Sequence, residues 1–121
     1  MSDPFFDTNI LIDWLKGRPP ALGELSRYNR HRISRIVWIE ILAGEPVETR
    51  DHIRELILPF EIVELDSRIA AAAADIRYRS RMKLLDAMIL ATAQVNGSIL
   101  VTRNTKDFPA EMPGVRVPYT L

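Results

Sequence analysis

The sequence predicts an α/β fold in which a parallel sheet is covered by helices on both faces. Short apolar runs alternate along the chain with longer segments whose apolar residues recur at helical spacing. Residues 98–102 form a continuous apolar run, which is typical of a central strand in a parallel sheet. No internal repeat or low-complexity segment divides the 121 residues, so we expect a single domain spanning residues 1–121.

The first half of the chain predicts a strand followed by helices, and then the same order again. Proline and glycine residues separate the segments, and the spacing of apolar residues within each segment indicates its type. The expected elements are a strand at residues 4–6, a turn at 7–9, a helix at 10–15, a helix around 20–29, an extended stretch at 31–36 and a helix at 37–43.

The second half continues this alternation and ends in an edge strand. Asp66 and Ser67 are suited to cap a helix, and Asn96 and Gly97 are suited to end one. The nearly all-apolar segment before Asn96 indicates a helix that is buried on most sides. The expected elements are a helix at residues 47–58, a strand at 60–65, helices at 69–78 and 84–95, the strand at 98–102 and a final edge strand at 115–117.

The composition favours a cytoplasmic protein over a secreted or membrane protein. The chain has no cysteine, so it can form neither a disulfide framework nor a thiolate zinc site. Its amino terminus lacks a basic segment followed by an apolar core, and its apolar runs are far shorter than the roughly 20 residues that span a bilayer. We therefore expect a cytoplasmic protein that does not associate with membranes.

The charge balance excludes binding of nucleic acid by bulk charge alone. Sixteen basic residues balance sixteen acidic ones, so local patches must supply any such contact. One basic cluster lies at residues 27–35. A second cluster, the distal basic patch, surrounds Tyr78 and comprises Arg77, Arg79, Arg81 and Lys83. Charge runs of this kind usually face solvent, and this is the alternative interpretation for both clusters.

Acidic and polar residues near the ends of predicted strands are the candidates for chemistry, because open parallel sheets place functional groups there. Asp7 closes the first strand, and Asn104 and Asp107 follow the central strand. Glu40 and Asp86 lie in otherwise apolar helices. A buried carboxylate at such a position pairs with a cation, takes up a proton or binds a metal.

Each of these acids also has a structural interpretation. Asp7 could cap the first helix, and Asp86 could lie in a first helical turn, where the helix dipole favours a carboxylate. Glu40 could pair with Arg35 or another arginine, and Asp107 could be a turn residue. Taken singly, the acids are therefore not assigned a role by the sequence.

Taken together, the acids favour a site for a hard divalent cation. Mg²⁺ and Mn²⁺ prefer oxygen ligands and need only one or two direct carboxylates per ion. The chain has no phosphate-binding glycine loop and no G-x-S-x-G elbow, and we expect its histidines, His31 and His52, in charged surroundings without a nucleophile. Hydrolysis by a metal-activated water is the chemistry that remains.

Four motifs, in this order, resemble the PIN domain family, in particular the VapC-type toxins of bacterial toxin–antitoxin pairs. The resemblance covers essentially the whole chain. The motifs are Asp-Thr-Asn-Ile-Leu at residues 7–11, Ser34 six residues before Glu40 with Gly44 after it, Asp-Ala-Met-Ile-Leu-Ala-Thr-Ala at residues 86–93, and Leu-Val-Thr-Arg-Asn-Thr-Lys-Asp-Phe at residues 100–108.

The resemblance implies a PIN-like three-layer α/β/α sandwich with a central parallel β-sheet, and endonucleolytic cleavage of RNA with Mg²⁺ or Mn²⁺ as cofactor. Many family members have an aspartate where this chain has Asn104, although Asn followed by an acid three residues later is also common. The implied site residues are the catalytic and metal-binding acids Asp7, Glu40 and Asp86, the further metal ligands Asn104 and Asp107, and the supporting residues Thr8, Asn9 and Ser34.

The resemblance also implies partners. A small VapB-like antitoxin would lay an apolar segment in a groove and direct a basic side chain into the acidic pocket, and two copies of the chain would form a homodimer. The distal basic patch would guide the RNA backbone toward the acids. Trp14, Trp38 and Phe60 could line partner surfaces, although buried core positions are the better expectation for each aromatic residue.

Two other classes of protein remain as alternatives. A PIN-like scaffold that has lost catalysis and serves as a binding module is kept open by Asn104. A Mg²⁺-binding receiver domain of signalling proteins fits less well, because such a domain has an acidic pair where this chain has Asp7 alone. The predicted strand at residues 60–65 also leads into a helix cap and not into a phosphorylated aspartate.

Overall fold

The computed structural model describes residues 3–120, and within that range it contains five strands and six helices. All strands belong to one parallel sheet with the order β3-β2-β1-β4-β5. In chain order the elements are β1 (Phe5–Phe6), α1 (Thr8–Leu15), α2 (Pro19–Ser26), β2 (Arg32–Ser34), α3 (Arg35–Ala43), α4 (Val47–Leu56), β3 (Glu61–Val63), α5 (Ser67–Arg79), α6 (Leu84–Val95), β4 (Leu100–Val101) and β5 (Val115–Arg116).

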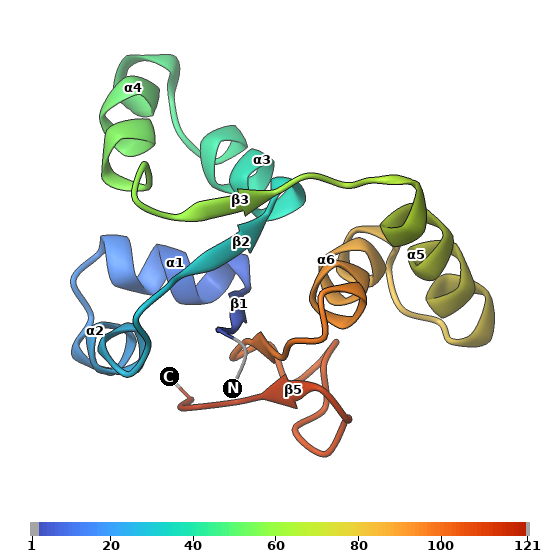
Figure 1. The fold of residues 1–121 in the computed structure, drawn as a ribbon. Coiled ribbons are helices and arrows are strands. Elements are labelled where there is room, and N and C mark those ends of the chain that lie inside the picture. The colour runs from blue at the N-terminus through green and yellow to red at the C-terminus, as the bar shows by residue number, and fades with distance from the viewer. Residues whose placement is uncertain (1–2, 121) are drawn as a thin grey trace.

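The sheet is the middle of three layers, with α1, α2 and α4 on one side and α5 and α6 on the other (Figure 1). The chain moves outward from β1 through β2 to β3 and then crosses back to β4. Because connections between parallel strands are almost always right-handed, this reversal places the later helices on the opposite face. The predicted α/β sandwich with a central parallel sheet is confirmed.

The core lies on both faces of the central strands. Phe5 and Phe6 of β1 and Leu100 and Val101 of β4 are fully buried, as expected for strands covered on both sides. Helix α6 packs its middle against the sheet, but Leu84 at its start is half exposed, so the expected burial on most sides begins only after its first turn. No helix in residues 3–120 has the length and apolarity needed to cross a membrane.

Several expected element boundaries differ from the observed ones by one to three residues, and at the starts of α1 and α3 the difference comes from helix capping. Asp7 has extended backbone and caps α1 directly, so the helix begins at Thr8 and the expected turn at residues 7–9 is absent. Ser34 caps α3 by accepting a hydrogen bond from Val37 N at 3.1 Å. The extended stretch predicted at residues 31–36 therefore ends at Ser34.

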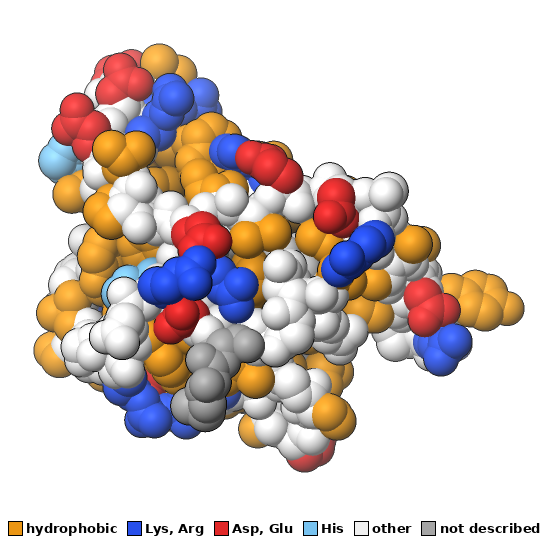
Figure 2. Space-filling model, in the orientation of Figure 1, with side chains coloured by type: hydrophobic (Ala, Val, Ile, Leu, Met, Phe, Trp, Pro, Cys, Tyr) orange, Lys and Arg blue, Asp and Glu red, His pale blue; other side chains and the backbone are white. Residues whose placement is uncertain are grey.

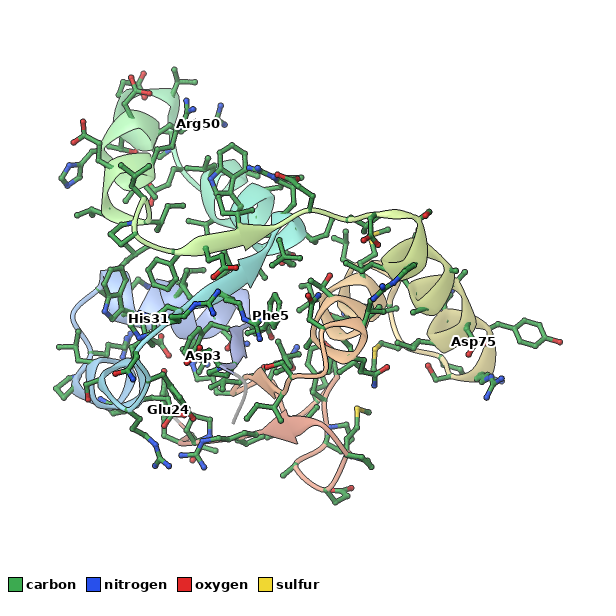
Figure 3. All side chains as sticks on the ribbon, in the orientation of Figure 1. Asp3, Phe5, Glu24, His31, Arg50 and Asp75 are labelled. Atoms are coloured by element: carbon green, nitrogen blue, oxygen red, sulfur yellow. The ribbon has the colours of Figure 1, made fainter. Side chains whose placement is uncertain are left out.

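The first basic cluster is largely tied to nearby acids. Arg30 pairs with Glu61, and Arg35 pairs with Glu64. His31 does not stand in the expected charged surroundings: its ring centroid lies 5.6 Å from that of Phe60 and 5.7 Å from that of Phe6. Its place just before β2 is labelled in Figure 3. This cluster therefore helps to hold β2 and β3 together through ion pairs, which the interpretation as a solvent-facing charge run did not include.

A buried ion pair joins α2 to the C-terminal edge of the sheet. Glu24 is 5% exposed and accepts hydrogen bonds from Arg116 Nε at 2.8 Å and Arg116 Nη2 at 3.1 Å. Tyr28 donates a third hydrogen bond to Glu24, whose position on α2 facing β5 is visible in Figure 3. Burial alone would raise the pKa of Glu24, but these donors outweigh it and hold the pKa below its usual value.

We expect Glu24→Gln to lower the free energy of unfolding by about 1–3 kcal/mol at neutral pH, because it leaves Arg116 half-buried without its charge partner. Since the pKa of Glu24 is lower in the folded protein, its contribution is present above the ordinary glutamate pKa of about 4.3 and is lost as the pH falls further. Urea denaturation of both proteins across this range tests the prediction, which fails if their difference does not shrink at low pH.

Candidate metal-binding site

The predicted site residues gather at the carboxyl edge of the sheet. Asp7 joins β1 to α1, Glu40 lies on α3, and Asp86 lies in the first turn of α6. Asn104 and Asp107 follow β4, which is the neighbour of β1 at the point where the strand order reverses. Such a switch point is the usual binding place of an open α/β sheet.

Asp7 is the most buried acid of this group, with 4% of its surface exposed. Its Oδ2 atom accepts a hydrogen bond from Thr102 Oγ1 at 2.7 Å and one from Asn9 Nδ2 at 3.3 Å, and its Oδ1 atom accepts one from Thr8 N at 2.8 Å. Burial raises the pKa of Asp7, and the charge of Glu40 raises it further against the effect of these donors. All of these donors are uncharged.

Glu40 is held toward Asp7 by the start of α1. Thr8 Oγ1 donates a hydrogen bond of 2.6 Å to Glu40 Oε1, so Thr8 contacts both acids, through its backbone and its side chain. The alternative pairing of Glu40 with Arg35 is wrong, because Arg35 pairs with Glu64. Ser34 acts on Glu40 only through the cap of the helix that carries it.

Asp86 shows that the acids face one another. Burial comes first among the causes that raise its pKa to about 6, and the negative charges of Asp107, Asp7 and Glu40 add to this effect. Lys83, at the N-terminal cap of α6, acts in the opposite direction. A divalent cation between these carboxylates would relieve their repulsion.

Asn104 and Asp107 form a reciprocal pair after β4. Asn104 Nδ2 donates to Asp107 Oδ2 at 2.9 Å, and Asp107 N donates to Asn104 Oδ1 at 3.3 Å. Asn104 N also donates to Thr102 Oγ1 at 3.0 Å, which links this pair to Asp7. Asp107 is thus both a turn residue and a member of the acidic group.

The side chains fit Mg²⁺ or Mn²⁺ in their donor chemistry. Among residues 3–120, no three Asp, Glu, His or Cys side chains converge closely enough to make a ready coordination set. Hard divalent cations keep several waters and use only one or two direct carboxylates, so they do not need such a set. Asp7 is buried and receives hydrogen bonds only from neutral donors. Asp86 is repelled by three other acids. The two carboxylates thus offer oxygen atoms in a negative field, as such a cation needs.

The distal basic patch lies near this edge but is partly engaged. Arg77 donates to the backbone carbonyl of Met82 at 2.9 Å, and Arg79 pairs at 3.0 Å with Asp75, which is labelled on α5 in Figure 3. Lys83 is the member that acts electrostatically on Asp86. The distal basic patch therefore runs from the end of α5 to Lys83, which lies close enough to Asp86 to lower its pKa.

Thr102 is a site residue that the sequence analysis missed. It is fully buried, donates to Asp7 and accepts from Asn104 N, so it joins two candidate ligands. The available signal was a hydroxyl residue at the end of an apolar central strand. Asp13, Arg103 and Tyr119 were also missed, because hydrogen bonds join them across 90 and 106 positions of the sequence.

A parallel sheet with carboxylate and amide side chains gathered at its switch point defines an α/β protein with an acidic site, and sequence comparison identifies the family. The chain matches the PIN domain family over residues 5–110 and therefore belongs to it. A comparison with curated proteins finds no significant match.

Solved structures share this fold along nearly their whole length. A chain of a toxin–antitoxin complex from Klebsiella pneumoniae is 40% identical, with a TM-score of 0.90 and coverage of 98% of this chain and 100% of that one. A chain of DNA-bound VapBC from Salmonella typhimurium is 27% identical, with a TM-score of 0.79 and coverage of 96% of each chain. A chain of FitAcB from Neisseria gonorrhoeae, 23% identical with a TM-score of 0.78 and coverage of 98% and 100%, shares the fold.

We expect Asp86→Asn to raise the free energy of unfolding of the metal-free protein by about 0.5–1 kcal/mol at neutral pH, because it removes one of several repelling charges. Chemical denaturation in EDTA measures this change. Glu48→Gln, which changes an exposed acid in the first turn of α4, is the control and should not stabilise the protein. A loss of stability in Asp86→Asn would contradict the described electrostatics.

Proposed function

We propose that this protein is a metal-dependent endoribonuclease and the toxin of a VapBC-type toxin–antitoxin pair. The observation that carries the proposal is the group of mutually repelling acids around buried Asp7, whose hydrogen bonds come only from neutral donors. Membership in the PIN domain family and the likeness to toxin–antitoxin complexes support it. We propose that it acts in the cytoplasm.

Mg²⁺ or Mn²⁺ at this site would supply the positive charge that acidifies a water molecule and stabilises the phosphodiester as it is cleaved. Asp7 and Asp86 would hold the cation, and Asn104 with Asp107 would complete its surroundings. Thr8 keeps Glu40 beside Asp7 through the 2.6 Å hydrogen bond, so both carboxylates are oriented before substrate arrives. This preorganisation avoids reordering side chains during the reaction.

We propose that the distal basic patch guides the RNA backbone to the acids. Arg81 follows α5 and Lys83 caps α6, so the two side chains lie along the path from the exposed helix end to Asp86. Tyr78 is 91% exposed between these basic residues, which suits it to stack on an unpaired base.

We propose that the antitoxin occupies an apolar groove between α3 and α4. Trp38, Ile39, Leu42 and Val47 line it, and it encloses about 470 Å³. Arg50, labelled on α4 in Figure 3, donates a hydrogen bond of 3.1 Å to the carbonyl of Leu42 and so fixes one end of the groove. Figure 2 shows hydrophobic side chains where α4 meets α3, with charged side chains around them. An amphipathic partner segment suits such a surface.

We also propose a homodimer. Leu84 and Leu85 at the start of α6 are about half exposed, and they offer apolar side chains to such an interface. Neither leucine lines the α3–α4 groove, so a second copy and an antitoxin could bind together.

The first test is cleavage of total bacterial RNA by the antitoxin-free protein with Mg²⁺, Mn²⁺ or EDTA. We expect discrete fragments that require metal, and we expect Asp7→Asn and Asp86→Asn to lower the rate by about 100-fold or more. Glu48→Gln should cleave like the wild type. Cleavage that persists in EDTA would contradict the proposal, and folded wild type that cuts none of several RNAs would favour the binding module.

Replacement of Arg81 by Gln should weaken RNA binding by about 3–10-fold and reduce the salt dependence of binding by about one charge. Filter binding of Asp86→Asn protein at several salt concentrations avoids cleavage during the measurement. Arg27→Gln in the first basic cluster is the matched control. Equal effects of the two substitutions would argue against a dedicated path along the distal basic patch.

Substitution of Val47 by Asp should weaken antitoxin binding by about tenfold while RNA cleavage stays unchanged, because the side chain is 73% exposed within the groove. Leu58→Asp is the matched control, since Leu58 is 79% exposed and does not line the groove. Calorimetric titration with the cognate antitoxin measures both. The proposal is wrong if only Leu58→Asp weakens the complex.

A further inference from the structure

Asp13 on α1 is a second buried acid, and its carboxylate is contacted by two arginines and a tyrosine. Asp13 is 1% exposed and accepts hydrogen bonds from Arg103 Nε at 2.6 Å and Arg103 Nη2 at 3.2 Å. Tyr119 donates its hydroxyl to Asp13 at 2.8 Å, and Arg18 Nε lies 3.5 Å from the carboxylate. Burial alone would raise the pKa of Asp13, but these donors hold it below the usual value.

Arg103 stands between two residues of the candidate site. Thr102 donates to Asp7, and Asn104 pairs with Asp107. The backbone N–H of Arg103 itself donates to Asn9 Oδ1 at 3.2 Å. The amide of Asn9 in turn lies within hydrogen-bond distance of both Asp7 and Thr102. The segment at residues 102–104 therefore contacts the start of α1 at several points. The Arg103 side chain donates two hydrogen bonds to Asp13, which lies further along the same helix.

We propose that Asp13 and Arg103 form a positioning pair that fixes the segment after β4 against α1, so that Asn9, Thr102 and Asn104 are held in place around Asp7. Asp13 follows Asp7 by six residues, which corresponds to about 9 Å along the helix axis. A segment attached at both places cannot pivot about either one. The inference rests on the proposed nuclease function for its effect on metal and rate, but not for its effect on geometry.

Tyr119 completes the pair from the C-terminal segment. Its hydroxyl and the Arg103 guanidinium share the Asp13 Oδ2 atom, and the residues after β5 are thereby tied to α1. Arg103 donates two hydrogen bonds to a buried carboxylate, and its guanidinium is therefore held inside the fold. In this respect it differs from the arginines of the distal basic patch. Loss of Arg103 should therefore alter catalysis and metal binding more than substrate binding.

The chain contains a matched control pair. Glu24 and Arg116 form the same bidentate contact, with side chains exposed by 4% and 34% against 2% and 32% for Asp13 and Arg103. That pair joins α2 to β5, and neither of its side chains bonds to a candidate site residue. The one link to the site is the backbone hydrogen bond of 3.0 Å from Thr102 N to Arg116 O, which a substitution of the Arg116 side chain leaves in place. Any effect of Arg103 that Arg116 does not share is thus an effect on the site and not on stability alone.

The experiment compares Arg103→Met with Arg116→Met. We expect similar losses of stability for both proteins. Only Arg103→Met should lower the affinity for Mn²⁺, measured by electron paramagnetic resonance, by about 10–100-fold. Only this substitution should also lower kcat by about 10–100-fold, with KM nearly unchanged. Only Arg103→Met should also shift the side-chain amide signals of Asn9 and Asn104 in nitrogen-15 NMR spectra. Arg103→Lys, which retains charge but not the bidentate contact, should recover part of the loss.

Equal effects of the two methionine substitutions on Mn²⁺ affinity, kcat and the amide signals would overturn the inference. If Arg103→Met fails to fold, Tyr119→Phe removes a single hydroxyl and should shift the same amide signals with a smaller loss of kcat. If the wild type neither binds Mn²⁺ nor cleaves RNA, the proposed function fails and the amide signals alone decide. Unchanged Asn9 and Asn104 signals in Arg103→Met would then refute the positioning role.

Discussion

Burial of the Asp7 carboxylate is the constraint on which the arrangement of the site depends. An ionised carboxylate out of contact with water is costly unless hydrogen-bond donors surround it. Here the donors come from Thr8 and Asn9 at the start of α1 and from Thr102 at the end of β4. Satisfying this one group therefore fixes how β1, α1 and β4 meet at the switch point of the sheet.

The buried acids differ in the charge of the groups that donate hydrogen bonds to them. Asp13 and Glu24 each receive an arginine and a tyrosine, which lower their pKa and leave them as parts of the framework. Asp7 receives only neutral donors and faces other acids, and its pKa is raised. An arginine lies close in sequence to the donors of Asp7, because Arg103 follows Thr102, yet its side chain pairs with Asp13 and not with Asp7. Lys83 opposes the rise in the pKa of Asp86 but does not cancel it, so a negative field remains at the sheet edge, which is what a cation site requires.

Much of the fold could be predicted because it is encoded locally. The α6 boundaries and the cap at Asp66 follow from short patterns, and acids near strand ends pointed to Asp7 and Asp86. The start of α1 was predicted two residues too late, although the structural interpretation of Asp7 as a helix cap is confirmed. The Asp13–Arg103 contact could not be predicted, since it joins residues 90 positions apart and neither residue breaks a local pattern. Long-range polar contacts leave no periodic signal in a single sequence.

The departure at Asn104 is understandable from its partner. Asn104 donates an amide N–H to Asp107 and accepts the Asp107 backbone N–H, so it holds the carboxylate and the loop at once. An aspartate at this position would lose that donor and would add another negative charge beside Asp107, whose charge already acts on Asp86. The substitution therefore moves the charge from position 104 to position 107 without removing it from the site. The Asn104 amide thus keeps a carboxylate oriented after β4 although position 104 itself carries no charge.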